Sequence, residues 1–218
     1  MRLLCLSDIH GEAEGLADLL SGPDRPDLVV VAGDITHLGG RVEAERVLEP
    51  VFAAGVPLVA VAGNMDRETA RSYLGERGVD LHGRGVLIQN VGFMGLGAGT
   101  PSPFRTPWEI DDEEAERCLQ KGFSEIAEAP FKVLVSHPPP RGTDLDRSRG
   151  HAHVGSAPVR RFIDAGRVGL CVCGHIHESA GLQVIGQTPC VNLGPFKSGH
   201  YARVTIEDGR ATVIRRTR

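Results

Sequence analysis

Short, unbroken hydrophobic runs recur along the chain, each bounded by turn-forming residues. The clearest of these runs cover residues 3–6, 28–32, 58–62, 132–135 and 169–172. Runs of this length without polar alternation are typical of strands that are buried on both faces of a sheet. Amphipathic stretches suited to helices follow the first three runs, at residues 12–20, 42–54 and 67–77. This order of strand, helix and strand predicts a parallel sheet.

After Gly78 the pattern changes to shorter apolar segments separated by glycine, at residues 86–89 and 93–96. We expect these segments to begin a second sheet. Helices are predicted over residues 108–129, which start with many acids, and over residues 156–164, with Ser156 as the N-cap. Hairpin-like segments follow at residues 182–185, 189–193, 201–206 and 211–215. The pattern predicts an α/β (α+β) protein, a single domain over residues 1–218, with two sheets and helices outside them.

Composition narrows the functional classes. The formal net charge is −4, and aromatic residues make up 5% of the chain. Both values argue against a binder of long nucleic acids, which needs a basic surface and stacking rings. No apolar run approaches the roughly 20 residues of a membrane span, and the run before Asp8 is too short for a signal-peptide core. Five cysteines without a C-x-x-C pair are expected to be reduced core residues, so we predict a cytoplasmic protein.

Polar motifs stand at the ends of the apolar runs. They are Asp8-Ile9-His10, Gly33-Asp34, Gly63-Asn64, His137 and Gly174-His175-Ile176-His177. In an extended segment residues i and i+2 point the same way, so each of the two D-x-H or H-x-H motifs can present both side chains to one pocket. In open α/β sheets ligands bind beyond the carboxyl ends of the strands. We therefore expect these side chains to meet at one edge of the molecule.

The order of these motifs resembles the signature of the calcineurin-like metallophosphoesterases. Within that superfamily the chain is similar to the Icc-related predicted phosphoesterases, in residues 32–37, 101–107, 147–156 and 173–179. The resemblance implies a four-layer αββα sandwich that carries a dinuclear metal centre. It also implies that one ion is held by Asp8, His10 and His177, the other by Asn64, His137 and His175, and that Asp34 bridges them.

The implied ligand set suits hydrolysis of a phosphoester. Imidazole, carboxylate and amide ligands favour Mn, Fe, Zn or Ni over Ca or Mg, and we expect Mn. Asn64 ligates without adding negative charge, so the centre keeps a surplus of about +2 for an anionic phosphoryl group. By the resemblance, hydroxide that bridges the two ions attacks phosphorus in line. Asp34 and Asn64 are then catalytic residues as well as ligands.

One position departs from the family pattern. Where most members carry a histidine in G-N-H-D, this chain reads Gly63-Asn64-Met65-Asp66. The family's histidine stabilises the transition state or protonates the leaving oxygen, and a thioether does neither at useful strength. Either another histidine substitutes, with His37 as the first candidate, or the leaving group needs no proton. The second case fits phosphodiesters and activated esters. Asp66 is expected to cap the helix that follows it.

A polar loop after His137 supplies candidate substrate-binding residues. Their side chains would donate hydrogen bonds to a phosphate or sugar group, and they are Arg147, Arg149, His151 and His153. A solvated loop without contact to substrate fits the sequence equally well. The acidic run 109–116 is expected to be a solvated helix surface.

The sequence thus predicts a metal-dependent phosphoesterase that acts on a small phosphoester, with a phosphodiester favoured. A phosphomonoesterase or a small-nucleotide diesterase is an alternative with the same chemistry. An alternative of another class is an interaction or scaffold module on the same fold with weak or no catalysis. Long nucleic acids and membranes are not expected as partners, and the sequence is compatible with a homo-oligomer formed through the outer helices or a sheet edge.

Overall fold

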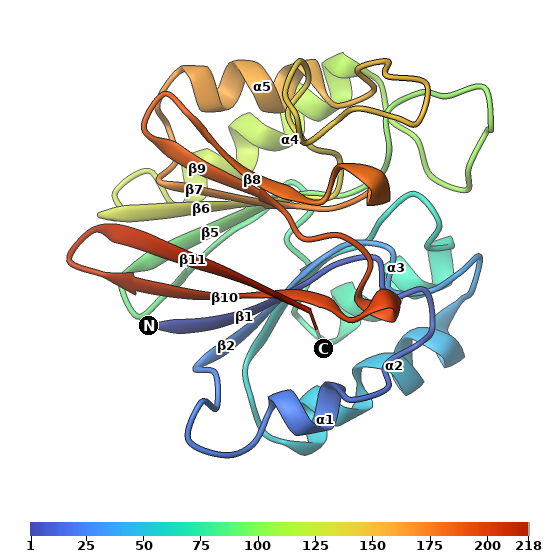
Figure 1. Cartoon of the computed structure of the whole chain (residues 1–218), viewed down its shortest axis with the longest axis vertical. Coiled ribbons are helices and arrows are strands. Elements are labelled where there is room, and N and C mark those ends of the chain that lie inside the picture. The colour runs from blue at the N-terminus through green and yellow to red at the C-terminus, as the bar shows by residue number, and fades with distance from the viewer. Residues whose placement is uncertain (218) are drawn as a thin grey trace.

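The chain forms two β-sheets that pack face to face, with helices covering both outer faces (Figure 1). This computed structural model describes residues 1–217. The layers follow the order helix, sheet, sheet, helix, so the predicted αββα sandwich is confirmed. Every helix within residues 1–217 is too short or too polar to span a bilayer.

The first sheet has the strand order β11-β10-β1-β2-β3. Its parallel strands are β1 (Arg2–Leu6), β2 (Leu28–Ala32) and β3 (Leu58–Val61). The antiparallel hairpin beside β1 consists of β10 (His200–Glu207) and β11 (Arg210–Thr217). The outer face is covered by α1 (Leu16–Leu19), α2 (Arg41–Ala53) and α3 (Glu68–Glu76). All residues of β2 are buried, as its unbroken hydrophobic run predicts.

The second sheet has the strand order β4-β5-β6-β7-β9-β8. Its central parallel strands are β5 (Val91–Leu96), β6 (Phe131–Ser136), β7 (Leu170–Cys173) and β9 (Thr188–Asn192). Antiparallel strands flank them at the two edges, β4 (Gly85–Ile88) and β8 (Gly181–Ile185). The outer face is covered by α4 (Asp112–Glu125) and α5 (Ala157–Asp164), and two short 3-10 turns follow as η1 (His177–Ser179) and η2 (Phe196–Ser198).

Alternate residues of the central strands enter different layers of the core. On β2, Val30 packs between the two sheets, together with Phe93 and Val172 of the second sheet. Val29 and Val31 instead pack against the helices of the first outer layer. Each fully buried aliphatic side chain stabilises the fold by about 1.5–3 kcal/mol relative to exposure. The strand ends are therefore held in place by packing on both faces.

Two predicted helices are shorter than the sequence pattern indicates. The predicted helix 108–129 begins only at Asp112, because the Asp111 side chain accepts the N–H of Glu114 and caps the helix there. The predicted helix 12–20 is a single turn, since Gly15 adopts a left-handed conformation with φ of 72° just before it. By contrast, Ser156 caps α5 as predicted.

Glu109 corrects the prediction that the whole acidic run 109–116 is solvated helix surface. Its carboxylate accepts hydrogen bonds from the backbone N–H and the hydroxyl of both Ser102 and Thr106. It lies before α4 and closes the proline-rich connector that leads into that helix. The acid therefore shapes a loop, and this loop forms one wall of the cleft described below.

Candidate metal centre

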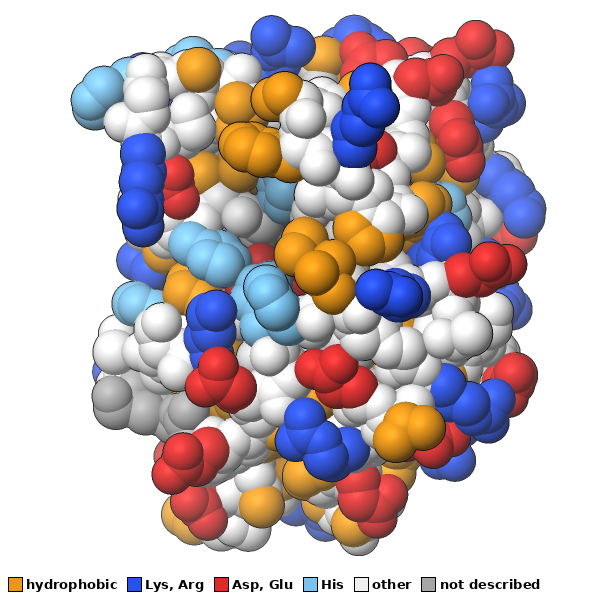
Figure 2. Space-filling model, turned by 90° about the vertical axis from the view of Figure 1, so that its right-hand side faces the viewer, with side chains coloured by type: hydrophobic (Ala, Val, Ile, Leu, Met, Phe, Trp, Pro, Cys, Tyr) orange, Lys and Arg blue, Asp and Glu red, His pale blue; other side chains and the backbone are white. Residues whose placement is uncertain are grey.

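The polar motifs meet at one edge of the sandwich. Five parallel strands end there, with β1, β2 and β3 in the first sheet and β6 and β7 in the second. Each motif starts within two residues of the end of its strand, so all of the side chains reach the same region. Figure 2 shows histidine side chains gathered on the face of the molecule at this edge.

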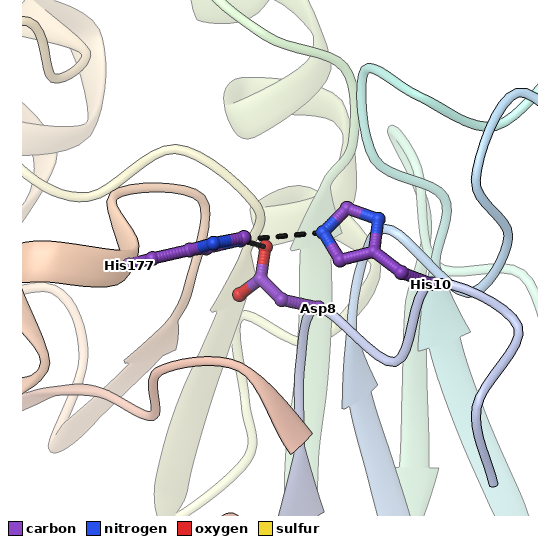
Figure 3. A group of neighbouring side chains, drawn as sticks. All are labelled: Asp8, His10 and His177. Carbon is purple, nitrogen blue, oxygen red and sulfur yellow. Dashed lines mark hydrogen bonds and ion pairs between the residues drawn. The ribbon is translucent and has the colours of Figure 1, made fainter. Parts of the chain in front are cut away.

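Asp8, His10 and His177 form the first group of possible ligands (Figure 3). The Nε2 atoms of His10 and His177 lie 3.2 Å apart, and Asp8 Oδ1 lies 3.2 Å from His177 Nε2. The Asp8 carboxylate is buried and accepts the backbone N–H of His175, which fixes its orientation. Two imidazole nitrogens and a carboxylate oxygen thus converge, as they would around one cation.

Asn64, His137 and His175 form the second group. His137 Nε2 lies 2.9 Å from Asn64 Oδ1, and the His137 and His175 rings meet edge to face with centroids 4.8 Å apart. His137 Nδ1 lies 2.8 Å from the carbonyl oxygen of Ala32, which accepts only. Nδ1 therefore carries a hydrogen, and in the neutral ring Nε2 is the nitrogen left to ligate a metal.

Asp34 lies between the two groups. Its Oδ2 is 3.8 Å from His10 Nε2, and its Oδ1 is 3.4 Å from His137 Nε2. The backbone N–H of Met65 donates to Oδ1 at 2.9 Å and holds the carboxylate in this orientation. The two oxygens of one carboxylate thus face different ligand groups, and this geometry fits a bridge between two metal ions.

The backbone is strained at several of these positions. Four of the seven residues have positive φ values, namely Asp8 at 52°, His10 at 50°, Asp34 at 48° and His175 at 70°. Residues other than glycine seldom adopt this conformation, although aspartate and histidine tolerate it better than most. Such strain persists where the surroundings impose it, and it clusters at functional sites. Here the strained turns direct the side chains toward the common centre.

Two motif glycines are required by close packing around the ligands. Gly33 has a φ of 93°, and a Cβ at this position would overlap the His137 ring. A Cβ on Gly63 would overlap both the carboxylate and the backbone nitrogen of Asp34. The glycines of the G-D and G-N motifs therefore leave space for ligands carried by neighbouring strands.

The charges of the site perturb its own side chains. Burial lowers the pKa of His137, but the Asp34 and Asp8 carboxylates outweigh burial and raise that pKa to about 9. Burial and the neighbouring His137 lower the pKa of His175 to about 4. Burial raises the pKa of Asp8, but the hydrogen bond and charges of the histidines hold the pKa well below its usual range. The carboxylates are thus ionised at neutral pH, as metal ligands must be.

We expect the binding of Mn²⁺ to release protons. Without metal, His137 is protonated below its pKa of about 9, and it must lose the Nε2 proton before it can ligate. The apparent affinity should therefore rise with pH through the neutral range and level off above about pH 9. Isothermal titration calorimetry in buffers of different ionisation enthalpy measures the released protons. An affinity that does not change between neutral pH and pH 9 would contradict the prediction.

The prediction that Asp66 caps α3 is wrong, because no side-chain hydrogen bond caps that helix. Its buried carboxylate instead accepts four hydrogen bonds of 2.7–3.1 Å, from the backbone N–H groups of Gly63, Ile35 and Thr36 and from the Thr36 hydroxyl. These bonds join the turn after β2 to the turn after β3, which carry the central carboxylate and the amide ligand. Burial and the nearby Asp34 carboxylate raise the pKa of Asp66 to about 6.

The chain matches the family model described as calcineurin-like phosphoesterase over residues 1–179. It belongs to the calcineurin-like phosphoesterase family. The resemblance inferred from the motifs is thereby confirmed. Members of this family are metal-dependent hydrolases of phosphoester bonds, and the two groups of possible ligands described above fit divalent metal ions.

Two curated proteins are similar to this chain over most of its length. An uncharacterized protein of Methanocaldococcus jannaschii is 32% identical over 203 residues, which cover 89% of this chain and 88% of that protein. The glycerophosphodiester phosphodiesterase GpdQ of Enterobacter lignolyticus is 27% identical over 179 residues, which cover 77% of this chain and 62% of that enzyme.

Solved structures show the same fold. The protein TT1561 of Thermus thermophilus superimposes with a TM-score of 0.72 at 18% identity, covering 98% of this chain and 97% of that one. A dimetal phosphatase from Danio rerio gives a TM-score of 0.66 at 17% identity, covering 100% of this chain and 96% of that one. The predicted calcineurin-like architecture is confirmed by these neighbours.

A cleft of about 720 Å³ opens beside Asn64 and His175 of this phosphoesterase. Two of the predicted substrate residues, Arg149 and His153, line the cleft. Arg147 and His151 line a neighbouring hollow of about 490 Å³, which Arg149 lines as well. The exposed His37 lies on the other side of the centre, where its ring meets the His10 ring edge to face with centroids 5.4 Å apart.

No sequence signal pointed to Asp146, which organises the loop that carries these residues. Asp144, two residues earlier, has a side chain that is 81% exposed, whereas the side chain of Asp146 is fully buried. Nothing in the local pattern distinguishes the two acids. Asp146 differs from Asp144 because residues 153–155 fold back over it and form hydrogen bonds with its carboxylate.

Proposed function

We propose that the protein is a phosphodiesterase that works with two divalent transition-metal ions. The observation that carries this proposal is the placement of Asp34, whose oxygens lie 3.8 Å from His10 Nε2 and 3.4 Å from His137 Nε2. One ion would be held by Asp8, His10 and His177, the other by Asn64, His137 and His175, with Asp34 between them.

The donor types support Mn²⁺, with Fe, Zn or Ni as alternatives, since imidazole, carboxylate and amide ligands suit these metals. Two such ions, when bound, would supply an activated water and a clamp for the attacking and leaving oxygens. The protein orients the ligands that hold them, through the Ala32 carbonyl on His137 and the Met65 N–H on Asp34. Asn64 adds no negative charge, so the centre stays attractive to an anionic phosphoryl group.

A diester is favoured because Met65 occupies the position of the family's usual histidine. A thioether offers no proton, so the chain must supply a donor elsewhere or act on esters that need little help. We propose that His37, next to His10, stabilises charge on the phosphoryl oxygens at that side of the centre. The relative named a glycerophosphodiester phosphodiesterase supports the same substrate class.

The part of the substrate beyond the phosphoryl group has room in the cleft and in the hollow next to it. We propose that the side chains there bind that part of a small phosphodiester, namely Arg147, Arg149, His151 and His153. Guanidinium groups recognise anionic and hydroxyl-rich groups by paired hydrogen bonds. Arg149 lines both hollows, so a substrate that fills the cleft would have room to extend into its neighbour.

We expect manganese-reconstituted protein to hydrolyse bis(4-nitrophenyl) phosphate about tenfold faster than 4-nitrophenyl phosphate, a difference of about 1.4 kcal/mol in the barrier. Both compounds release nitrophenol, so the ratio reports preference for the diester and not leaving-group acidity. Initial rates are measured before metal stripping, after it, and after reconstitution. Faster hydrolysis of the monoester would contradict the diester preference. Metal binding without turnover of either compound would favour an interaction module.

A further inference from the structure

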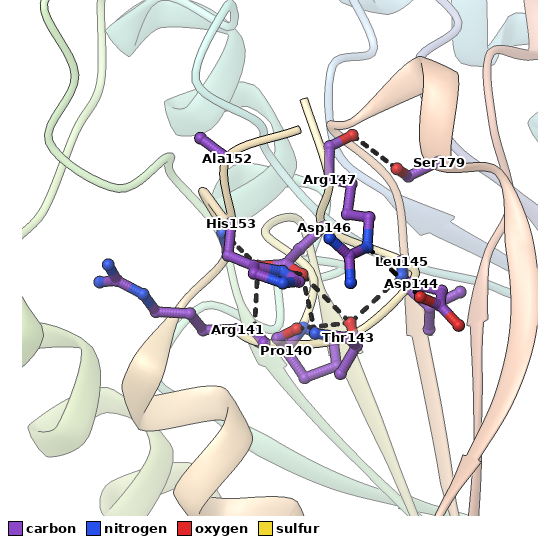
Figure 4. A network of polar contacts seen from close by, with 12 residues as sticks. Pro140, Arg141, Thr143, Asp144, Leu145, Asp146, Arg147, Ala152, His153 and Ser179 are labelled. Carbon is purple, nitrogen blue, oxygen red and sulfur yellow. Dashed lines mark hydrogen bonds and ion pairs between the residues drawn. The ribbon is translucent and has the colours of Figure 1, made fainter. Parts of the chain in front are cut away.

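Asp146 forms the centre of a polar network in the loop that follows β6 (Figure 4). Its carboxylate accepts the N–H groups of Gly142 at 3.1 Å, Thr143 at 2.9 Å and Gly155 at 3.0 Å. Nδ1 of His153 lies 2.6 Å from Asp146 Oδ1. One buried carboxylate thus joins the beginning and the end of the loop and holds the ring of His153.

The hydrogen bond between His153 and Asp146 decides which ring nitrogen of His153 carries a hydrogen. Burial raises the pKa of Asp146, but the hydrogen bonds from His153 and from the backbone outweigh burial, so the pKa lies below its usual value. Asp146 is therefore an anion at neutral pH and can only accept a hydrogen bond. Nδ1 of His153 must be the donor, and Nε2 remains for another partner.

His153 lines the cleft that also contains the ligand side chains Asn64 and His175. Its side chain is 32% exposed, so the ring is accessible from the cleft while Asp146 is fully buried behind it. Arg141 and Arg149 also line the cleft and favour an anionic or oxygen-rich group. The acids Glu109, Asp112 and Glu178 also line the cleft. His153 thus lines the same cleft as two side chains of the candidate metal centre, and a substrate held at that centre would share this cleft with its ring.

We propose that His153, positioned by Asp146, is the general acid that protonates the leaving oxygen of the diester. The proposal rests on the proposed phosphodiesterase function and deepens it. Water supplies the attacking oxygen and loses one proton to solvent as a new P–O bond forms, and the bond from phosphorus to the leaving oxygen breaks. Its electron pair goes to the leaving oxygen, which takes the proton from His153 Nε2 and departs as an alcohol. His153 is left neutral with Nδ1–H still bonded to Asp146, and solvent returns the proton.

A general acid at His153 also explains how the protein would work with Met65 in place of the family's histidine. The side chain of Met65 cannot donate a proton, and its backbone N–H is used by Asp34. His37 is exposed, and no hydrogen bond orients its ring among residues 1–217, whereas the ring of His153 is fixed by a buried anion. The proton donor therefore lies in the loop after β6, and not at the histidine position of the G-N-H-D motif.

The experiment compares two diesters with different leaving groups, bis(4-nitrophenyl) phosphate and diphenyl phosphate, in manganese-reconstituted protein. Phenol has a pKa of about 10, like tyrosine, so it departs poorly without a proton. Nitrophenol is more acidic and departs as an anion. The variant is His153→Asn, whose amide N–H takes the place of Nδ1 toward Asp146 while Nε2 is lost. A matched His37→Asn variant tests the competing histidine.

We expect His153→Asn to lower kcat/KM on diphenyl phosphate by about 10²–10⁴-fold, the usual contribution of general-acid help. The loss on bis(4-nitrophenyl) phosphate should stay below about tenfold, because nitrophenol departs as an anion and needs no proton. A purely structural role of His153 would instead lower both rates equally. Equal losses on the two diesters, or none, would overturn the proposal. It would also be overturned if His37→Asn, and not His153→Asn, abolished the phenol reaction selectively.

A readout independent of metal and turnover completes the test. Nitrogen-15 spectra of the metal-free protein should show a protonated Nδ1 at His153, with a downfield proton signal that is missing in His153→Asn. A ring that carries its hydrogen on Nε2 alone would overturn the proposal. Wild-type protein that hydrolyses neither diester would overturn the phosphodiesterase function and this assignment together. Wild-type activity with no leaving-group effect of His153→Asn would overturn this assignment alone.

Discussion

Replacing Asp34 with asparagine should lower kcat/KM on bis(4-nitrophenyl) phosphate by about 10³-fold, the scale of losing one preorganised charge-stabilising group. The substitution keeps the size of the side chain but leaves one acceptor oxygen, which cannot face both ligand groups. The new NH₂ group would also oppose either the N–H of Met65 or the ligand side. Initial rates and metal content, measured on the same preparation, test this expectation. The metal content should fall together with the rate.

A matched control for Asp34→Asn is Asp18→Asn. Asp18 is exposed on α1, in the helix layer below the first sheet, and the substitution removes the same charge. Rate and metal content should remain those of the wild type. The bridging role would be wrong if Asp34→Asn retained two ions and more than about a tenth of the activity.

The second large effect is expected for Gly63→Ala. The new Cβ would overlap the carboxylate and the backbone nitrogen of Asp34, and the backbone nitrogen cannot move aside cheaply. Overpacking of this kind costs about 1–3 kcal/mol of stability. Displacement of a reacting group by about 1 Å typically lowers activity by roughly 10²-fold. Thermal unfolding and the rate on bis(4-nitrophenyl) phosphate measure the two effects.

Gly75→Ala is the matched control for this steric prediction. Gly75 lies in the last turn of α3, and no atom outside its own helix backbone lies within 4 Å of a Cβ placed there. Alanine in a helix is more stable than glycine by up to about 1 kcal/mol, so the control should not lose stability and should keep its activity. If Gly63→Ala behaved like Gly75→Ala, close packing would not be what holds Asp34.

The site illustrates how a rigid scaffold supports strained functional turns. β1, β2 and β3 are buried on both faces, apart from Arg2 at the start of β1, and hold the turns that carry Asp8, Asp34 and Asn64. The buried carboxylate of Asp66 joins two of these turns. Left-handed φ values at Asp8 and Asp34 then direct charged groups toward one another. Packing energy in the core thus maintains an arrangement that the turns would not adopt alone.

The two-sheet architecture could be predicted from the sequence because the signals that define it are local. An unbroken run such as residues 28–32 predicts a strand buried on both faces, and Ser156 followed by Pro158 marks a helix start. The predicted helix boundaries were less accurate where a single residue outside the periodic pattern determined the end of the helix. Asp111 delayed α4, and Gly15 reduced the first predicted helix to one turn.

The sequence by itself determined which side chains would meet at the candidate metal centre. Parallel strands end at a common edge, so residues placed directly after them are brought together by any correct pairing of the strands. Only the tertiary structure decided the roles of Asp66, Glu109 and Asp146, and the division of the candidate substrate loop between two hollows. Each of these acids accepts hydrogen bonds from turns or loops whose shape no residue pattern specifies. Which acid is buried there depends on how distant segments fold back over it, and that information exists only in three dimensions.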